Sequence, residues 1–200
     1  MKLVNKKGFT LVELLIVIGL LGAIALIVIS AINPIEQANR ARDTKYKADA
    51  GQLISAIDRY FVTISAFPWM TNSPATYPSA DTAFNYVSAQ SDDVGLCGAT
   101  CTVDGLLIQN NELKTEFKQR DFVKGSPTLT NQIMVGKDSG SSTSVYACFV
   151  PLSKSVRDKA CTDGKVYTLA TSVRTSVATS ACVSTSTNWS TSPYYVCLPE

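Results

Sequence analysis

Histidine is absent from the 200-residue sequence. This excludes, within the chain, Ser–His–Asp and Cys–His catalysis, histidine general bases and histidine-ligated metals. Paired Cys-x-x-Cys motifs are also absent, and no pair of acidic residues has a spacing typical of a catalytic site. The sequence therefore predicts a protein that is not an enzyme and that needs no cofactor and no metal.

The chain also lacks a large net charge, because 18 basic residues face 16 acidic ones. Three of the basic residues, Lys2, Lys6 and Lys7, precede Gly8. Without them, 15 basic residues would remain against the same 16 acids. Net charge therefore gives no support for general binding to polyanions.

One local cluster of basic and aromatic residues fits a contact with DNA phosphates and bases. A solvated helix with two core aromatics is the favoured interpretation, so DNA is a possible partner without support. If DNA uptake were the role, loss of Lys114, Lys118 and Arg120 together would abolish DNA binding. The cluster comprises Lys114, Phe117, Lys118, Arg120, Phe122 and Lys124.

Cysteine is confined to the second half of the chain, where six residues form an even set. An even set beyond a membrane segment is typical of disulfides in an oxidising compartment. A zinc site is the alternative, which the irregular spacing disfavours. Short loops favour three local pairings among the possible connectivities: Cys97–Cys101, Cys148–Cys161 and Cys182–Cys197.

Charge is almost missing from the run between Phe9 and Ile32, where Glu13 is the one ionisable side chain. At about 1.5 Å per residue, a helix of this length spans the hydrocarbon core of a bilayer. The lysines before the run place the N-terminus in the cytoplasm and the remainder outside. The run exceeds the roughly 7–15 apolar residues of a secretory signal, and SAINPIEQ offers no small-residue cleavage site. A plain signal anchor would explain everything except GFTLVE.

The stretch KKGFTLVELLIVIGLLGAIA resembles the N-terminal signature of type IV pilins and of the related pseudopilins of type II secretion systems. The shared features are a short basic leader that ends in Gly8, Phe9 as the new first residue, Glu13, and the apolar helix. The resemblance implies that a prepilin peptidase cuts between Gly8 and Phe9 and methylates the new Phe9 amine. It also implies that Glu13 pairs with the Phe9 amine of a neighbouring subunit during assembly.

A physical reason supports that pairing. An unpaired charge at mid-membrane costs roughly 2.5–3.5 kcal/mol on insertion scales. Cleavage turns the Phe9 nitrogen from an uncharged amide into an amine that is mostly protonated at neutral pH. In a water-poor helix bundle, this ammonium and the Glu13 carboxylate offset each other's desolvation. The local alternatives are that Glu13 stabilises its own helix N-terminus or meets the amine of its own chain.

The resemblance predicts a structural subunit of a type IV pilus or pseudopilus. The implied partners are copies of the chain, other pilins, prepilin peptidase, an inner-membrane assembly platform with a separate ATPase, and membrane lipid before assembly. A surface pilus is favoured over a periplasmic pseudopilus for two reasons. The mature chain would have 192 residues, which exceeds the length of many major pseudopilins, and disulfides suit exposed fibres. The alternatives are a type II secretion pseudopilin and a non-polymerising, single-pass anchored adhesin or binding module.

The expected fold is α+β, with a long N-terminal helix packed on a small antiparallel sheet. We expect a leader at 1–8, a transmembrane and assembly helix at 9–33, an amphipathic helical spine at 34–65 and an extracytoplasmic domain at 66–200. Pro34 predicts a kink or break near 30–33. An apolar stripe on the spine should face the domain core: Tyr46, Ala50, Leu53, Ile54, Ile57, Tyr60, Phe61 and Ile64. The charged start of the spine should be solvated: Glu36, Arg40, Arg42, Asp43, Lys45, Lys47 and Asp49.

The outer domain shows weaker patterns. Residues 67–87 are expected to form a loop, and 171–192 a solvated loop or edge strand. Asn110 or Asn111 should cap a short surface helix that ends near Gly125. Asp138 and Asp163 lie in glycine-containing turns, where turn chemistry is favoured over calcium. The strand candidates are 132–136, 144–150, 165–170 and 194–198.

Overall fold

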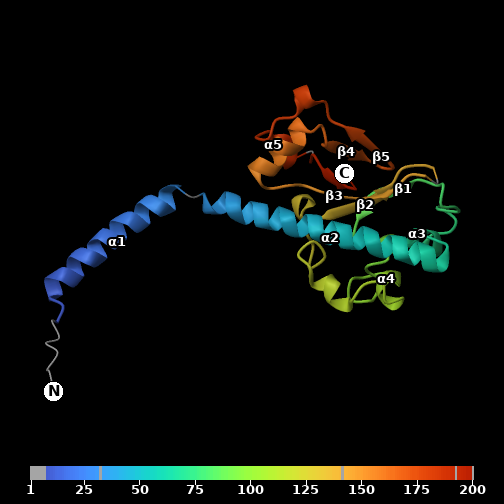
Figure 1. The fold of residues 1–200 in the computed structure, drawn as a ribbon. Coiled ribbons are helices and arrows are strands. Elements are labelled where there is room, and N and C mark those ends of the chain that lie inside the picture. Colours follow the sequence, from blue (N-terminus) through green and yellow to red (C-terminus); the bar gives the residue numbers. More distant parts are fainter. Residues whose placement is uncertain (1–7, 32, 141, 192, 200) are drawn as a thin grey trace, which may run out of the picture. The chain divides into compact units, whose positions relative to one another are not determined.

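The computed structural model describes residues 8–31, 33–140, 142–191 and 193–199. The chain forms two compact units, one ending at Ala38 and the other beginning at Asn39. The helices are α1 (Leu11–Ala31), α2 (Pro34–Ile64), α3 (Pro68–Asn72), α4 (Leu106–Gln109) and α5 (Lys154–Thr162). The strands are β1 (Phe84–Ser88), β2 (Ile133–Lys137), β3 (Val145–Phe149), β4 (Tyr167–Ala170), β5 (Val173–Ser176) and β6 (Val196–Leu198) (Figure 1). Short 3₁₀ turns lie at Asp92–Val94, Thr115–Gln119, Leu129–Asn131, Thr179–Ala181 and Thr187–Trp189.

Helix α1 is apolar on every side. All its side chains from Leu11 to Ile29 are exposed, and it is the one helix in the described part of the chain that is long and apolar enough to cross a membrane. A helix that is apolar all round requires lipid or protein around its whole circumference. The helix ends at Ala31, and Pro34 begins α2, at the position where the missing N–H of proline is tolerated.

Helix α2 buries one face within the second unit. Tyr46, Ala50, Leu53 and Ile57 are almost fully buried in the main core, which also includes Tyr60 and the partly buried Ile54 and Phe61. The predicted apolar stripe is therefore confirmed, except that Ile64 is 44% exposed. Because the stripe recurs at three- and four-residue steps, it stays on the side of the helix that faces the sheet.

The sheet has two covered faces. Its four strands are antiparallel in the order β1-β2-β3-β6. Val145, Ala147 and Phe149 of β3 belong to the core that contains α2, whereas Cys148 belongs to a second cluster with α5 residues. Figure 1 shows the sheet between α2 and the layer of α5, β4 and β5. The predicted α+β class, with helix on an antiparallel sheet, is confirmed.

The strand predictions are confirmed in outline, since β2, β3, β4 and β6 lie within one residue of or inside the expected segments. Strand β1 was not expected, because it lies in the proline-containing segment read as a loop. Its register shifts between Phe84 and Val87, and both side chains contact the same core. Such a bulge removes the simple alternation from which a strand is predicted. Strand β5 lies in the tract expected as a loop or edge strand.

The prediction of a surface helix from Asn110 or Asn111 to near Gly125 is wrong. Asn111 instead follows α4 in the left-handed region, with φ of 58°, and the segment contains only a 3₁₀ turn at Thr115–Gln119. Phe117 and Phe122 are both buried in one core. Residues five apart on an α-helix point about 140° away from each other, so an irregular backbone is needed to bury both rings.

Two of the three predicted disulfides are wrong. Cys97 pairs with Cys101 as expected, but Cys148 pairs with Cys197 and Cys161 pairs with Cys182. Cys148 and Cys197 are directly opposite in the β3–β6 ladder. The prediction ranked pairings by loop length, which contains no information on which strands are neighbours.

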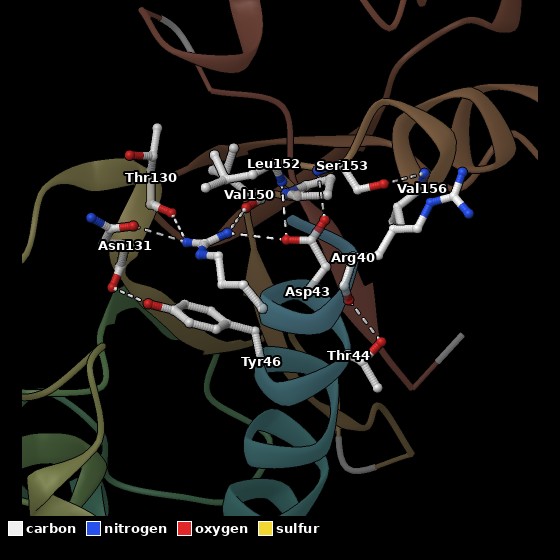
Figure 2. Close-up of polar contacts among 12 residues, drawn as sticks. Arg40, Asp43, Thr44, Tyr46, Thr130, Asn131, Val150, Leu152, Ser153 and Val156 are labelled. Atoms are coloured by element: carbon white, nitrogen blue, oxygen red, sulfur yellow. Dashed lines mark hydrogen bonds and ion pairs between the residues drawn. The ribbon is translucent and has the colours of Figure 1, made fainter. Parts of the chain in front are cut away.

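The prediction that the charged start of α2 is solvated is wrong for Asp43, which is 2% exposed. Its Oδ1 accepts a hydrogen bond from the Leu152 N–H at 3.0 Å, and its Oδ2 accepts one from the Ser153 N–H at 2.8 Å. Figure 2 shows the carboxylate facing this backbone, just before α5. The Arg42 guanidinium donates to Asp43 Oδ1 at 3.1 Å and to the Val150 carbonyl at 3.0 Å. These donors satisfy the buried carboxylate and join α2 to the β3–α5 connection.

Asp49 is also buried, at 2% exposed, but it has fewer partners. Its Oδ1 lies 3.6 Å from the Arg120 guanidinium, and its Oδ2 has no hydrogen-bond partner among the described residues. Burial raises the pKa of Asp49, although the nearby Arg120 and Lys45 charges oppose the shift. In contrast, the hydrogen bond and charge of Lys45 lower the pKa of the exposed Asp121.

These opposite shifts predict opposite responses to pH. The folded state binds the Asp49 proton more tightly than the unfolded state does, so this group favours folding at low pH and loses that contribution as the pH rises through its folded pKa. Asp49→Asn should therefore increase stability, relative to the unmodified chain, more at pH 7 than at pH 4. Asp121→Asn should lose stability at pH 7, and this loss should fade as the pH falls. Urea unfolding of the full chain in detergent at both pH values measures the two differences, and equal differences at both pH values would contradict the assignment.

Candidate functional site

Reciprocal hydrogen bonds between Thr10 and Glu13 cap the N-terminus of α1. The Thr10 hydroxyl oxygen accepts from the Glu13 N–H at 3.2 Å. In return, Glu13 Oε2 accepts from the Thr10 N–H at 3.4 Å and from the Thr10 hydroxyl at 3.3 Å. This arrangement is a capping box, which satisfies backbone donors that the first turn of a helix leaves open.

The capping box places Glu13 in a local role in the single chain. The carboxylate stabilises the start of its own helix, as one of the local alternatives proposed. Sequence reasoning missed Thr10, although TLVE before an apolar run matches the Ser/Thr-x-x-Asp/Glu capping pattern. Both contacts use Oε2, and Oε1 has no hydrogen bond to any other described residue. A carboxylate accepts about four hydrogen bonds in all, so the box leaves acceptor capacity unused.

The expected cleavage position lies just before this capped start. Gly8 and Phe9 are outside any helix or strand; an added Cβ on Gly8 would meet no atom within 4 Å, and Phe9 is 83% exposed. An exposed backbone outside regular secondary structure is a suitable substrate for a protease. The expected leader lysines Lys2, Lys6 and Lys7 lie outside the described residues.

The basic and aromatic cluster near residue 120 does not form one DNA-binding surface. Phe117 and Phe122 are buried, which removes the rings from stacking on bases. Lys118 is 8% exposed, and its ammonium lies 2.5 Å from the Asp104 carboxylate. Arg120 faces Asp49. The structure therefore places both rings of the expected cluster in the core and also buries Lys118.

The two turn aspartates have protein partners. Asp138 accepts from the Tyr86 hydroxyl at 3.3 Å and lies 3.7 Å from the Arg174 guanidinium. Asp163 accepts from Lys159 at 3.0 Å. Within the described ranges, no three His, Cys, Asp or Glu side chains gather in a way that could hold a metal ion.

The capping box can be tested by a change at Thr10. Thr10→Val removes the hydroxyl at nearly constant volume, whereas Thr10→Ser retains it. Loss of such a cap costs about 0.5–2 kcal/mol, so amide exchange of the first turn of α1 should accelerate roughly 2- to 30-fold in Thr10→Val. Hydrogen exchange of the full chain in detergent micelles measures this rate. Equal rates in the Val and Ser variants would show that the box does not hold the helix start.

The comparisons with known proteins agree with this geometry. The model of the prokaryotic N-terminal methylation motif matches residues 3–29, which include the expected cleavage position, Thr10, Glu13 and most of α1. Neither the curated proteins nor the solved structures include a match to the chain. The chain therefore has, at its N-terminus, the prepilin signature that is shared by type IV pilins and pseudopilins.

Proposed function

We propose that the chain is the precursor of a structural subunit that polymerises through α1 into a type IV pilus or pseudopilus. The observation that supports this most strongly is the methylation motif at residues 3–29, in which one acid occupies the capped start of a helix that is otherwise apolar and exposed. In this proposal, prepilin peptidase cuts between Gly8 and Phe9 and methylates the new amine. The work of the protein is assembly, and the chemistry is performed by the peptidase.

Cleavage changes what Glu13 can bind. The new Phe9 amine is a cation, and after one methylation it still has two N–H donors. A neighbouring subunit can present this cation to Glu13 Oε1 while Oε2 keeps its bonds to Thr10. The capping box therefore holds the carboxylate in place before assembly, and pairing between subunits adds to it rather than competing with it.

The apolar surface of α1 supplies the remaining driving force and determines the register. Each side chain from Leu11 to Ile29 is exposed in the single chain and needs lipid or other helices around it. In a bundle without water, an unpaired Glu13 would cost several kcal/mol. In this proposal, the axial offset between neighbouring subunits is the one that brings the Phe9 amine of one subunit to Glu13 of the next, which avoids this cost. Gly19 and Gly22 have open space around them and allow neighbouring helices to approach closely.

The same proposal gives a location and further partners. The lysines of the leader keep the N-terminus in the cytoplasm, so the unit that begins at Asn39 is extracytoplasmic. Its three disulfides are compatible with an oxidising compartment. An inner-membrane platform with a separate ATPase, together with other pilins, would extract and stack the subunits. A surface pilus is favoured over a secretion pseudopilus by the length of the mature chain.

Processing provides the first test. The mature protein extracted from membranes of its native host should begin with N-methyl-Phe9 in mass spectrometry. Gly8→Leu should block cleavage, because a side chain at this position obstructs the close approach of the peptidase to the backbone. Gly19→Leu is the matched control, since it also lies in open space and should be trimmed normally. A native, active chain that retains Lys2 would contradict the proposal and favour an unprocessed anchored binding module.

Assembly provides the second test, and two variants separate charge from capping. Glu13→Gln can still cap the helix but has no charge for the Phe9 cation, whereas Thr10→Val loses the cap and keeps the charge. Glu13→Gln and Glu13→Ala should both insert and be cleaved, yet leave less than about a tenth of the subunits in sheared filaments, since roughly 1.4 kcal/mol of lost pairing is a tenfold loss. Normal filaments from Glu13→Gln would show that pairing with the amine is not required.

A further inference from the structure

Two of the disulfides are nested along the chain. The bond from Cys148 to Cys197 spans 49 residues. The bond from Cys161 to Cys182 spans 21 residues and lies wholly inside that loop. We call these two bonds the native pairs. Cysteines that are joined in the order in which they follow one another give two other bonds, which we call the neighbour pairs: Cys148–Cys161 and Cys182–Cys197.

Loop closure favours the neighbour pairs for as long as the chain is unfolded. Cys148 is 13 residues from Cys161 but 49 from Cys197. In a flexible chain the probability of contact falls with about the 3/2 power of loop length, so Cys148 meets Cys161 roughly sevenfold more often than it meets Cys197. Cys197 is also the last of the six cysteines to be synthesised. Oxidation before folding therefore produces the neighbour pairs first.

The fold supplies the native partner of Cys148 only through its last strand. Cys197 lies in β6, which has three residues, and it faces Cys148 in the β3–β6 ladder. Before β6 pairs with β3, nothing in the sheet holds the two cysteines opposite each other. Cys161 is in α5, the next element after β3, and it belongs with Cys148 to the second buried cluster. A partly folded unit without β6 therefore still offers Cys148 the neighbour thiol.

The packed unit protects the native pairs from exchange. Cys148 is fully buried, and Cys161 and Cys197 are 9% and 2% exposed. A thiolate that attacks a disulfide needs access to one of its sulfur atoms. A neighbour pair must therefore be exchanged before this cluster closes, while the chain is incompletely folded.

We propose that maturation of the chain includes an exchange step, in which a dithiol isomerase converts the neighbour pairs into the native pairs. This inference rests on the proposed function for its location alone, since it places the unit that begins at Asn39 in an oxidising compartment. A disulfide-donating oxidase forms the bonds beforehand and takes up two electrons and two protons for each. The exchange itself consumes two disulfides and forms two, so it needs no further oxidant.

Three thiolate attacks complete the exchange. An isomerase thiolate attacks the Sγ atom of Cys161, and the Cys148 thiolate leaves. The Cys148 thiolate then attacks the Sγ atom of Cys197, which releases the Cys182 thiolate. Finally, the Cys182 thiolate attacks Cys161 in the mixed disulfide, and the isomerase thiolate is regenerated.

The experiment dilutes the reduced, full chain from urea into a nonionic detergent that contains diamide, which oxidises thiols without leaving a free thiol to catalyse exchange. Samples are blocked with N-ethylmaleimide, digested in denaturant and mapped by mass spectrometry. No lysine or arginine lies between Cys182 and Cys197, so chymotrypsin, which cuts after Trp189, is needed beside trypsin. Cys148–Cys161 should at first exceed Cys148–Cys197 about sevenfold. Substoichiometric, reduced protein disulfide isomerase, added after the diamide is removed, should reverse this ratio.

Two double variants with equal numbers of thiols provide the controls. Cys161→Ala with Cys182→Ala removes the competing thiols, so the remaining native pair should form with diamide alone. Cys97→Ala with Cys101→Ala removes the pair that is already consecutive, and this variant should still need the isomerase.

The proposal is wrong if diamide alone gives the unmodified chain as large a fraction of native pairs as diamide followed by isomerase. Equal dependence of the two double variants on the isomerase would also overturn it. The mapping uses neither processing nor filaments, so its failure would leave the proposed function standing. An unprocessed native chain would contradict the proposed function without changing the map.

Discussion

A carboxylate that is removed from water needs hydrogen-bond donors or a cation as partners. This requirement of Glu13 links the start of α1 to the proposed role of the protein. Glu13 satisfies it locally, through the N–H and hydroxyl of Thr10 at the start of α1. The same contacts also cap the end of a helix that begins just after the expected cleavage site. They leave one carboxylate oxygen available to a cation that appears only after cleavage. The acid at the start of this apolar helix thus has one role in the single chain and a second in the proposed filament.

The same constraint applies in the unit that begins at Asn39, where two acids of α2 receive different numbers of donors. Asp43 receives two backbone N–H groups and the Arg42 guanidinium, so its burial joins the helix firmly to the chain before α5. Asp49 receives only a distant Arg120 and keeps one oxygen without a partner among the described residues. The donors on Asp43 therefore fix the position of the helix, whereas burial of the incompletely paired Asp49 raises its pKa and makes its contribution to stability fall as the pH rises.

Much of the fold was predictable because its signals are local. The apolar run that becomes α1 follows from composition and length, the stripe of α2 from periodicity, and four of the six strands from β-branched and aromatic residues between breaks. The candidate site at Gly8, Phe9 and Glu13 is equally local, and Thr10 could have been identified from the capping pattern. The helix expected near residues 110–125 failed for a different reason. Phe117 and Phe122 are drawn into the same core, and that demand overrides the local preference for a helix.

The sequence by itself determined that the chain has a membrane-length apolar helix with one acid, an amphipathic helix after Pro34, and a sheet-forming outer domain. Tertiary structure alone decided that Cys148 pairs with Cys197, that Cys161 pairs with Cys182, and that Asp43 is a buried anchor rather than a solvated charge. The physical reason is the range of the interactions involved. Helix and strand patterns arise from neighbours within a turn or two, whereas disulfide partners and the donors of a buried carboxylate come from segments that only the folded sheet brings together.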